Sequence, residues 1–208
     1  MNSVQKISYD EAHPWILHKH YAKRIPSITH AYGVYEGGFL TGVVTFGMAP
    51  NYLLPTGLFG SVVGEQFKKN VLELNRLVVD TESQNIPSQL IAGAFRLLPQ
   101  KTVVVSYADS GMGHLGYVYQ ATNWLYTGKT VEYFAKVEKE GRHTRHATTK
   151  ATHKIKKTAK YRYVYFVGPK KWKKKMTKLL KYPILPYPKG DTSRYDDTYQ
   201  PKVQMVMF

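Results

Sequence analysis

The chain has 208 residues, of which 43% are hydrophobic, so it is long enough to bury a sizeable core as one domain. Its 30 Lys and Arg residues against 14 Asp and Glu residues give a formal net charge of +16, which favours a polyanionic partner, nucleic acid before an anionic membrane. The absence of cysteine excludes disulfides and thiolate metal sites. No stretch approaches the roughly 20 apolar residues of a membrane span, and the amino terminus lacks the apolar core of a signal peptide. We therefore expect a cytoplasmic protein with no membrane partner.

Residues 1–124 predict helices that alternate with strands. In chain order the elements are a short helix within 8–22 that breaks near Pro14, a hairpin over 30–47 that turns at Glu36-Gly37-Gly38, a Pro/Gly-rich loop over 48–60, and a short helix followed by a strand over Leu72–Val79. A helix over 85–99, a buried strand over 101–109 and a helix over 114–124 follow. This alternation predicts an α/β fold whose sheet is largely covered by helices.

The composition changes near residue 136. Residues 136–160 are basic and rich in threonine, 161–167 alternate as a strand, 169–181 predict a basic helix, and a proline-rich tail follows. We expect 136–208 to form a basic, partly extended carboxyl-terminal region of a single domain that spans 1–208.

The basic segments predict contacts with the DNA backbone. Cations and hydroxyl side chains both bind phosphate, although charge runs are also common on solvated faces. The candidate contacts are Arg142, Arg145, Lys150, Lys154, Lys171, Lys173, Lys174 and Lys175.

Polar residues also occur where strands end or where apolar residues surround them. Asp109 and His114 follow the buried strand at 101–109, and ligands of open α/β sheets generally bind beyond the carboxyl ends of strands. Asp109 could instead cap the next helix, and His114 could be a surface histidine. Glu73 lies among apolar neighbours, where a buried carboxylate is costly unless it is paired. Arg76 lies on the opposite face of a regular strand, so it is not an obvious partner for Glu73.

The strand–helix–strand–helix unit from Glu73 to Trp124 resembles the core of the GNAT acyltransferases. In that family, free N–H groups at a helix amino terminus hold the pyrophosphate of an acyl-coenzyme A. The resemblance implies donor contacts from Asn85 and Ser88, with Asn123 as a third candidate, although Ser88 also fits a helix cap. The usual glycine-rich loop is missing from "TESQNIPSQL", which is a departure from the family. Tyr119 falls where many of these enzymes keep a general-acid tyrosine.

A second resemblance extends over residues 18–189. The segments "HYAKRIPS", "YGVYEGG", "TFGMAPN", "ELNRLVVD", "NIPSQLIAGAFRLL", "SYADSGMGHLGYVYQATNWLYTG", "YRYVYFVG" and "LKYPILPYPK" occur in order. The set is similar to the phage Mom DNA-modification proteins, which are GNAT-like. The resemblance implies a mixed central sheet flanked by helices and transfer of a methylcarbamoyl group to N6 of adenine, which protects phage DNA from host restriction. The implied partners are double-stranded DNA and acetyl-CoA or a related acyl-CoA donor, in the cytoplasm of the infected bacterium.

The implied reaction makes demands on the site. Methylcarbamoyl contains a nitrogen that acyl transfer alone cannot place, so the family's association with iron is chemically reasonable. His20, Tyr21, Asp109 and His114 offer the hard donors that such a site needs. The same four residues, with Glu73 and Tyr119, form the expected reaction centre.

The acceptor makes a further demand, because N6 of adenine is paired inside the duplex and the base must leave the stack to react. The 17 tyrosines and 3 tryptophans could hold it by stacking, but the sequence does not say which of them does. Two alternatives remain open: an ordinary acyltransferase that acts on a small amine or a protein, and a non-catalytic DNA-binding protein on the same fold.

Overall fold

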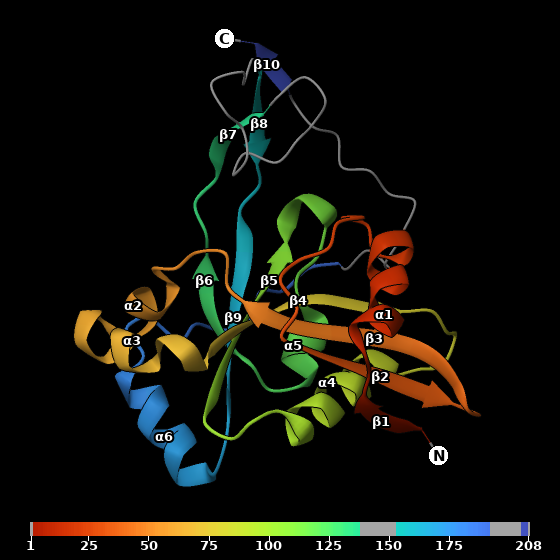
Figure 1. The fold of residues 1–208 in the computed structure, drawn as a ribbon. Coiled ribbons are helices and arrows are strands. Elements are labelled where there is room, and N and C mark those ends of the chain that lie inside the picture. Colours follow the sequence, from red (N-terminus) through yellow and green to blue (C-terminus); the bar gives the residue numbers. More distant parts are fainter. Residues whose placement is uncertain (1, 138–152, 192–204, 208) are drawn as a thin grey trace.

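A computed structural model describes residues 2–137, 153–191 and 205–207. At its centre is a seven-stranded mixed sheet with the order β1-β2-β3-β4-β5-β9-β6 (Figure 1). In that order the strands are β1 (Ser3–Lys6), β2 (His30–Glu36), β3 (Phe39–Met48), β4 (Val71–Val79), β5 (Thr102–Asp109), β9 (Lys160–Val167) and β6 (Leu125–Lys129). A smaller sheet projects from one end of the molecule and has the order β10 (Met205–Met207), β8 (His153–Lys157) and β7 (Tyr133–Val137).

Helices cover both faces of the central sheet. They are α1 (Tyr9–Pro14), continued by a π-helical turn over Trp15–Lys19, then α2 (Leu54–Phe59), α3 (Ser61–Phe67), α4 (Ile86–Leu97), α5 (Tyr117–Ala121) and α6 (Lys170–Leu179). Successive side chains of a strand point to opposite faces. Accordingly, Val104 of β5 packs in the core under α4, whereas Val103 and Val105 pack in the core under α2 and α6. None of the helices in these ranges has the length and apolar character needed to cross a bilayer.

Strands β4 and β5 form a parallel pair that opens like a fork. Their register runs only from Val71 to Glu73 on β4 and from Val103 to Val105 on β5. Beyond that point both strands continue without pairing to each other, β4 to Val79 and β5 to Asp109. The carboxyl halves of these two strands therefore part, and a space opens between them.

Strand β4 also carries a β-bulge. Thr45 of β3 is opposite Arg76, but the next residue, Phe46, is opposite Leu74, so Asn75 has no counterpart on β3. A bulge interrupts the strict alternation of side chains between the two faces of a strand. Side chains before and after Asn75 therefore do not follow the pattern of a regular strand.

The expected α/β fold, with a mixed sheet flanked by helices, is confirmed, as are the hairpin and the elements at β4, α4, β5, β9 and α6. The loop predicted over 48–60 was wrong in part, because α2 lies within it and buries most of its apolar side chains. The helix predicted over 114–124 is shorter, since Gly116 and Asn123 take left-handed backbone angles, with φ 80° and 60°. Within the region predicted as a basic extension, β9 lies between β5 and β6 in the central sheet, and its Tyr163 is fully buried.

Candidate active site

An open cleft of about 1070 Å³ lies where β4 and β5 part. It is bounded by the loop after the π-helical turn, the β3–α2 loop, the β4–α4 loop, α5 and the ends of β7 and β8 nearest the central sheet. The polar side chains that line it include His20, Tyr21, Arg24, Glu73, Asn75, Arg76, Ser106, His114, Tyr119, Lys157, Thr158 and Lys160. Five of the residues expected in the reaction centre thus meet in one cavity, although they come from four separate parts of the chain.

His20, Tyr21 and His114 form an aromatic group in this cleft. The rings of His20 and Tyr21 stack with their centroids 4.3 Å apart, and Tyr21 meets His114 edge-on at 5.9 Å. His20 is only 5% exposed, whereas histidines are on average only partly buried. Burial, helped by the charges of Arg76 and His114, lowers the pKa of His20 to about 3. The imidazole is therefore neutral near pH 7.

The hydrogen bond to His20 also fixes where its proton is. The backbone N–H of Ala22 donates to Nδ1 of His20 at 3.0 Å. Since one nitrogen of a neutral imidazole accepts while the other carries the hydrogen, Nε2 is the protonated nitrogen. His20 is therefore the Nε2–H tautomer.

The two residues at the bulge clamp the loop that carries His20 and Tyr21. The amide of Asn75 donates to the carbonyl of Ser27 at 2.8 Å and accepts from the hydroxyl of Thr45 at 2.7 Å. Arg76 donates to the carbonyl of Arg24 at 3.0 Å. The loop over 20–27 is thus attached to β4 by side-chain contacts with its backbone.

The bulge also corrects the expectation that Arg76 faces away from Glu73. Both side chains line the cleft, because the extra residue shifts the alternation of the strand. Burial lowers the pKa of the Arg76 guanidinium, whereas the nearby Tyr21 and Glu73 act in the opposite direction. The Nε of Arg76 is buried and has no hydrogen-bond partner among the residues described.

Tyr119 and Ser106 form a buried polar pair at the base of the cleft. Ser106 Oγ lies 2.8 Å from Tyr119 Oη and 2.9 Å from the carbonyl oxygen of Leu74. A hydroxyl has one proton, so when Ser106 donates to the carbonyl, Tyr119 donates to Ser106. Burial raises the pKa of Tyr119 to about 12, and the phenol is therefore protonated at neutral pH.

Asp109 is held firmly just outside the lining of the cleft. Its Oδ1 accepts from the N–H of Gly111 at 3.0 Å and from the hydroxyl of Thr158 at 2.6 Å, and its Oδ2 pairs with Lys160 Nζ at 2.8 Å. Burial raises the pKa of this carboxyl, but Lys160 and the hydrogen bonds outweigh burial and hold the pKa below its usual value. The negative charge in turn raises the pKa of Tyr21, together with burial, to about 12. Asp109 thus both caps the turn over Ser110–Met112 and acts on the cleft through its charge.

A family model described as the Mom protein family matches residues 2–189. The chain belongs to the Mom protein family. The methylcarbamoylase mom of Escherichia phage Mu is 30% identical over 206 residues, a match that covers 89% of this chain and 83% of that protein.

Among solved structures, this Mom-family chain is similar to N-acetyltransferases. The ribosomal-protein-S18-alanine N-acetyltransferase from Escherichia coli has a TM-score of 0.48 and 8% identity, covering 81% of this chain and 96% of that one. An N-acetyltransferase from Staphylococcus aureus Mu50 also has a TM-score of 0.48, with 12% identity over 80% of this chain and 99% of that one.

The expected iron ligands of this Mom-family protein lie near one another but do not fit a four-ligand site as they stand. Both oxygens of Asp109 already accept hydrogen bonds or pair with an ammonium. A histidine that binds a metal normally donates its other ring N–H, whereas Nδ1 of His20 accepts from Ala22. In the described ranges, no three His, Asp or Glu residues gather as a metal site would require. We therefore propose no step of the reaction through iron.

The expected donor contacts lie at the rim of the cleft or outside it. Asn85 is exposed at the start of α4 with φ 64°, and its carbonyl accepts from the Ser88 hydroxyl at 2.8 Å. Asn123 is exposed in the turn that ends α5. The lining at this end of the cleft comes instead from Thr81, Glu82, Ser83 and Pro87.

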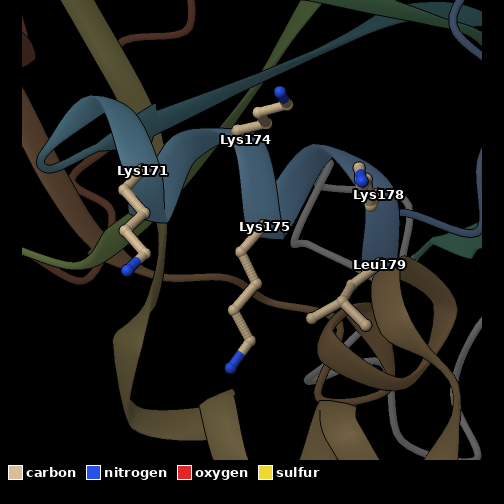
Figure 2. Close-up of a pocket in the computed structure, with 5 residues that line it drawn as sticks. All are labelled: Lys171, Lys174, Lys175, Lys178 and Leu179. Carbon is tan, nitrogen blue, oxygen red and sulfur yellow. The ribbon is translucent and has the colours of Figure 1, made fainter.

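The candidate DNA contacts fall into separate groups. Four lysines, Lys171, Lys174, Lys175 and Lys178, line a shallow hollow on one face of α6 (Figure 2). Lys173 faces the protein instead, since its ammonium donates to the hydroxyl of Tyr165 at 3.1 Å. Lys154 is exposed on β8. Arg142, Arg145 and Lys150 lie outside the described residues.

Sequence reasoning missed several side chains of the cleft. The missed residues are Arg24, Ser106, Thr158 and the lysines at 157 and 160. Ser106 did give a signal, because it is a single polar residue at the end of the run "TVVVS" and is only 1% exposed. The lysines gave none, since they are indistinguishable from the other cations of a basic segment.

Proposed function

We propose that this protein is a DNA modification enzyme that transfers a methylcarbamoyl group to N6 of adenine in double-stranded DNA. The observation that carries the proposal is the match to the Mom protein family over residues 2–189, and the name of the phage Mu relative supplies the transferred group. The net charge of +16 supports an anionic acceptor. In this proposal the enzyme acts in the cytoplasm of a phage-infected bacterium and protects phage DNA from restriction.

The transfer requires one proton to leave N6 and another to reach the leaving group. A bond forms between N6 and the carbonyl carbon of a donor that already carries the methylcarbamoyl group, and the bond from that carbon to its leaving atom breaks. Acetyl-CoA itself lacks the nitrogen of this group, so an earlier step that supplies the nitrogen must precede the transfer. Because the lone pair of N6 is delocalised into the ring, a base that accepts the N6 proton helps the attack. Burial lowers the pKa of His114, so its imidazole is neutral and able to accept this proton. Glu73 is the second candidate, as it lines the same cleft.

Tyr119 is our candidate for the acid that protonates the leaving atom. Tyr119 lines the cleft and remains protonated at neutral pH. When the Ser106 hydroxyl donates to Tyr119 Oη, the phenol proton is free for the leaving atom. The proton that Tyr119 gives up balances the one that the base takes from N6. His20 and Tyr21 would position the acceptor, and Asp109 would stabilise positive charge that develops on His114, whose pKa its charge raises.

We propose that the donor is a coenzyme A thioester and that it binds in the space between the carboxyl halves of β4 and β5. The β4–α4 loop brings Glu82 to the cleft and has no glycine, and Pro87 has no N–H to offer a phosphate. We therefore expect the pyrophosphate to be held less tightly than by a helix start with free N–H groups. Calorimetry with acetyl-CoA tests the donor class directly, and Ser88→Ala should alter the affinity little.

The function is tested by expressing the protein in bacteria and analysing nucleosides of the cellular DNA by mass spectrometry. We expect methylcarbamoyl-deoxyadenosine with the wild type and a loss of about 100-fold or more with Tyr119→Phe, the typical effect of removing a general acid. Tyr9→Phe is the matched control, since Tyr9 is 51% exposed and does not line the cleft.

Other outcomes of this experiment separate the alternatives. Unmodified DNA together with acetylation of a small amine or a protein would favour an ordinary acyltransferase. Tight DNA binding with no modification of any substrate would favour a non-catalytic DNA-binding protein.

A further inference from the structure

Strands β7 and β8 form a ribbon that extends from the wall of the cleft, and β10 pairs with the outer part of β8. The chain leaves β6 at Lys129, enters β7 at Tyr133, and returns along β8 to join β9 at Lys160. Thr130 and Thr158, at the two places where the ribbon meets the central sheet, both line the cleft. Figure 1 shows this β7–β8 ribbon projecting away from the central sheet. The ribbon therefore begins at the candidate active site and continues outward.

The two faces of the ribbon differ in their relation to the cleft. Tyr133 is opposite Lys157, and cross-strand partners share a face. Both of these side chains line the cleft. Phe134 is opposite Lys156 on the other face, and neither lines the cleft. One face of the ribbon thus presents an aromatic ring and a cation to the cleft.

Tyr133 is the more exposed of the two exposed aromatic residues that line the cleft. It is 61% exposed, whereas Tyr117 is 40% exposed and donates to the carbonyl of Gly190. A phenol ring left in water at the mouth of a cleft gains from stacking on a flat partner. Nucleobases are such partners, because every base has a π-face.

Lys157, the partner of Tyr133 across the ribbon, lies near two further cations of the cleft. Arg24, Lys157 and Lys160 all line the cleft, and Lys160 is paired with Asp109. Burial lowers the pKa of Lys157, and the charges of Lys160 and Arg24 lower it further, whereas Asp109 raises it, so Lys160 and Arg24 lie close enough to Lys157 to repel it. Such crowding favours an anionic ligand that lowers the mutual repulsion. Phosphates of a nucleic acid strand beside a stacked base meet both requirements.

We propose that the β7–β8 ribbon docks the DNA and that Tyr133 stacks on the target adenine as it leaves the duplex at the mouth of the cleft. The proposal rests on the proposed function, since it takes DNA as the acceptor. DNA beside the ribbon lies outside the cleft, so an adenine must leave the stack to reach the buried reaction centre. Tyr133 stands between these two places, at the mouth of the cleft and on the ribbon.

The lysine face of α6 does not meet the same conditions. Its four lysines do not line the cleft, and α6 lies at the opposite end of the molecule from the β7–β8 ribbon in Figure 1. The hollow in Figure 2 contains Leu179 but no aromatic ring. The α6 face can hold a backbone, but it cannot stack on a base that enters the cleft.

The test compares two duplexes by fluorescence anisotropy. In the first, central adenines pair with thymine, and in the second the same adenines face abasic sites. The wild type should prefer the second duplex, because extrusion there needs no base pair to be broken. Tyr133→Ala should weaken binding to the second duplex by about 5- to 100-fold, the usual effect of removing a stacking aromatic. Tyr133→Phe, which keeps the ring, should bind nearly as the wild type does.

Phe134→Ala is the matched control, because Phe134 is 55% exposed on the other face of the same strand. It should change the affinity for either duplex by less than about 2-fold if Tyr133 alone stacks. Equal losses in Tyr133→Ala and Phe134→Ala, or a Tyr133→Phe variant as weak as Tyr133→Ala, would overturn the proposal. In that case wild-type methylcarbamoyl-deoxyadenosine in cellular DNA would still support the proposed function, so the two failures are distinguishable.

Discussion

At the scale of single residues, Asp109 combines a structural and an electrostatic role. A carboxylate that only caps a turn can be replaced by Asn with little loss, because Asn caps as well as Asp does. Here, however, Oδ2 faces the ammonium of Lys160 at 2.8 Å, and the Asp109 side chain is only 16% exposed. An amide at this position would lose the ion pair. The contacts of Asp109 thus determine how much its replacement lowers the free energy of unfolding.

We predict that Asp109→Asn lowers the free energy of unfolding by about 1–2 kcal/mol, a range that allows for the partial exposure of Lys160. Denaturant unfolding at pH 7 measures this change. In a Lys160→Gln background the same substitution should cost less, because the ammonium is already gone. Equal costs in the two backgrounds would show that the ion pair contributes nothing.

The same variant tests the role of Asp109 in the reaction. Folded Asp109→Asn should still bind DNA but leave adenines unmodified, since the charge that acts on His114 and Tyr21 is lost. Modification at the wild-type level by this variant would make Asp109 purely structural.

At the scale of elements, the fold places the His20–Tyr21 loop by a close backbone contact. A Cβ atom added to Gly47 of β3 would lie 1.8 Å from the carbonyl oxygen of Ser27. Only glycine at this position lets the loop lie against the sheet, and Asn75 then bonds the same carbonyl. Gly47 leaves room for the carbonyl of Ser27, and Asn75 at the bulge donates a hydrogen bond to it, so both residues hold the loop at Ser27.

We predict that Gly47→Ala displaces this loop and lowers DNA modification by up to about 100-fold, because misplacement of a reactive group by about 1 Å can have that effect. Hydrogen exchange should become faster over 21–29, while the buried strand residues Val43 and Val44 remain protected. Asn75→Ala should produce the same pattern through loss of the hydrogen bond to Ser27. Unchanged exchange in the loop of both variants would contradict this account.

At the scale of the whole molecule, the charge of +16 is distributed over surfaces that face different directions. The lysine face of α6 and the β7–β8 ribbon lie at opposite ends of the molecule (Figure 1). Each phosphate contact contributes about 0.9 to the slope of log K against log salt for duplex DNA. The slope therefore counts the lysines that touch phosphate, wherever they lie.

We predict that changing Lys174 and Lys175 together to Ala flattens this slope by about 2 units if both touch phosphate. Lys6→Ala with Lys69→Ala is the control, since it removes the same charge from exposed positions on β1 and beside α3. An equal change in the two double variants would indicate a general effect of net charge. An unchanged slope for Lys174 and Lys175 would assign them to solvent and leave the ribbon as the main contact.

Local patterns in the sequence were sufficient for the elements whose signals are local. The glycines of the β2–β3 turn, the apolar run "TVVV" of β5 and the alternation of "YRYVYFV" in β9 each predict an element that the structure contains. The proline at the start of α4 and the apolar residues that the helix buries likewise predict this helix. These signals work because turn geometry and burial periodicity depend on residues close together in the chain. The expectation of a polyanionic partner rests on net charge alone and stays a prediction.

The arrangement of the cleft was decided by the tertiary structure. Asp109 meets Lys160 because these two residues are opposite each other in the register of β5 and β9, and it meets Thr158 across 49 positions of the chain. Arg76 enters the cleft because β4 bulges against β3 at Asn75. Strand register and bulges depend on packing between segments far apart in sequence, so no local pattern encodes them. The sequence by itself therefore determined β2, β3, β4, β5 and β9 and the net charge of the chain, but not β1, β6, β7, β8 or β10. Only the pairing of the strands decided which side chains share the site.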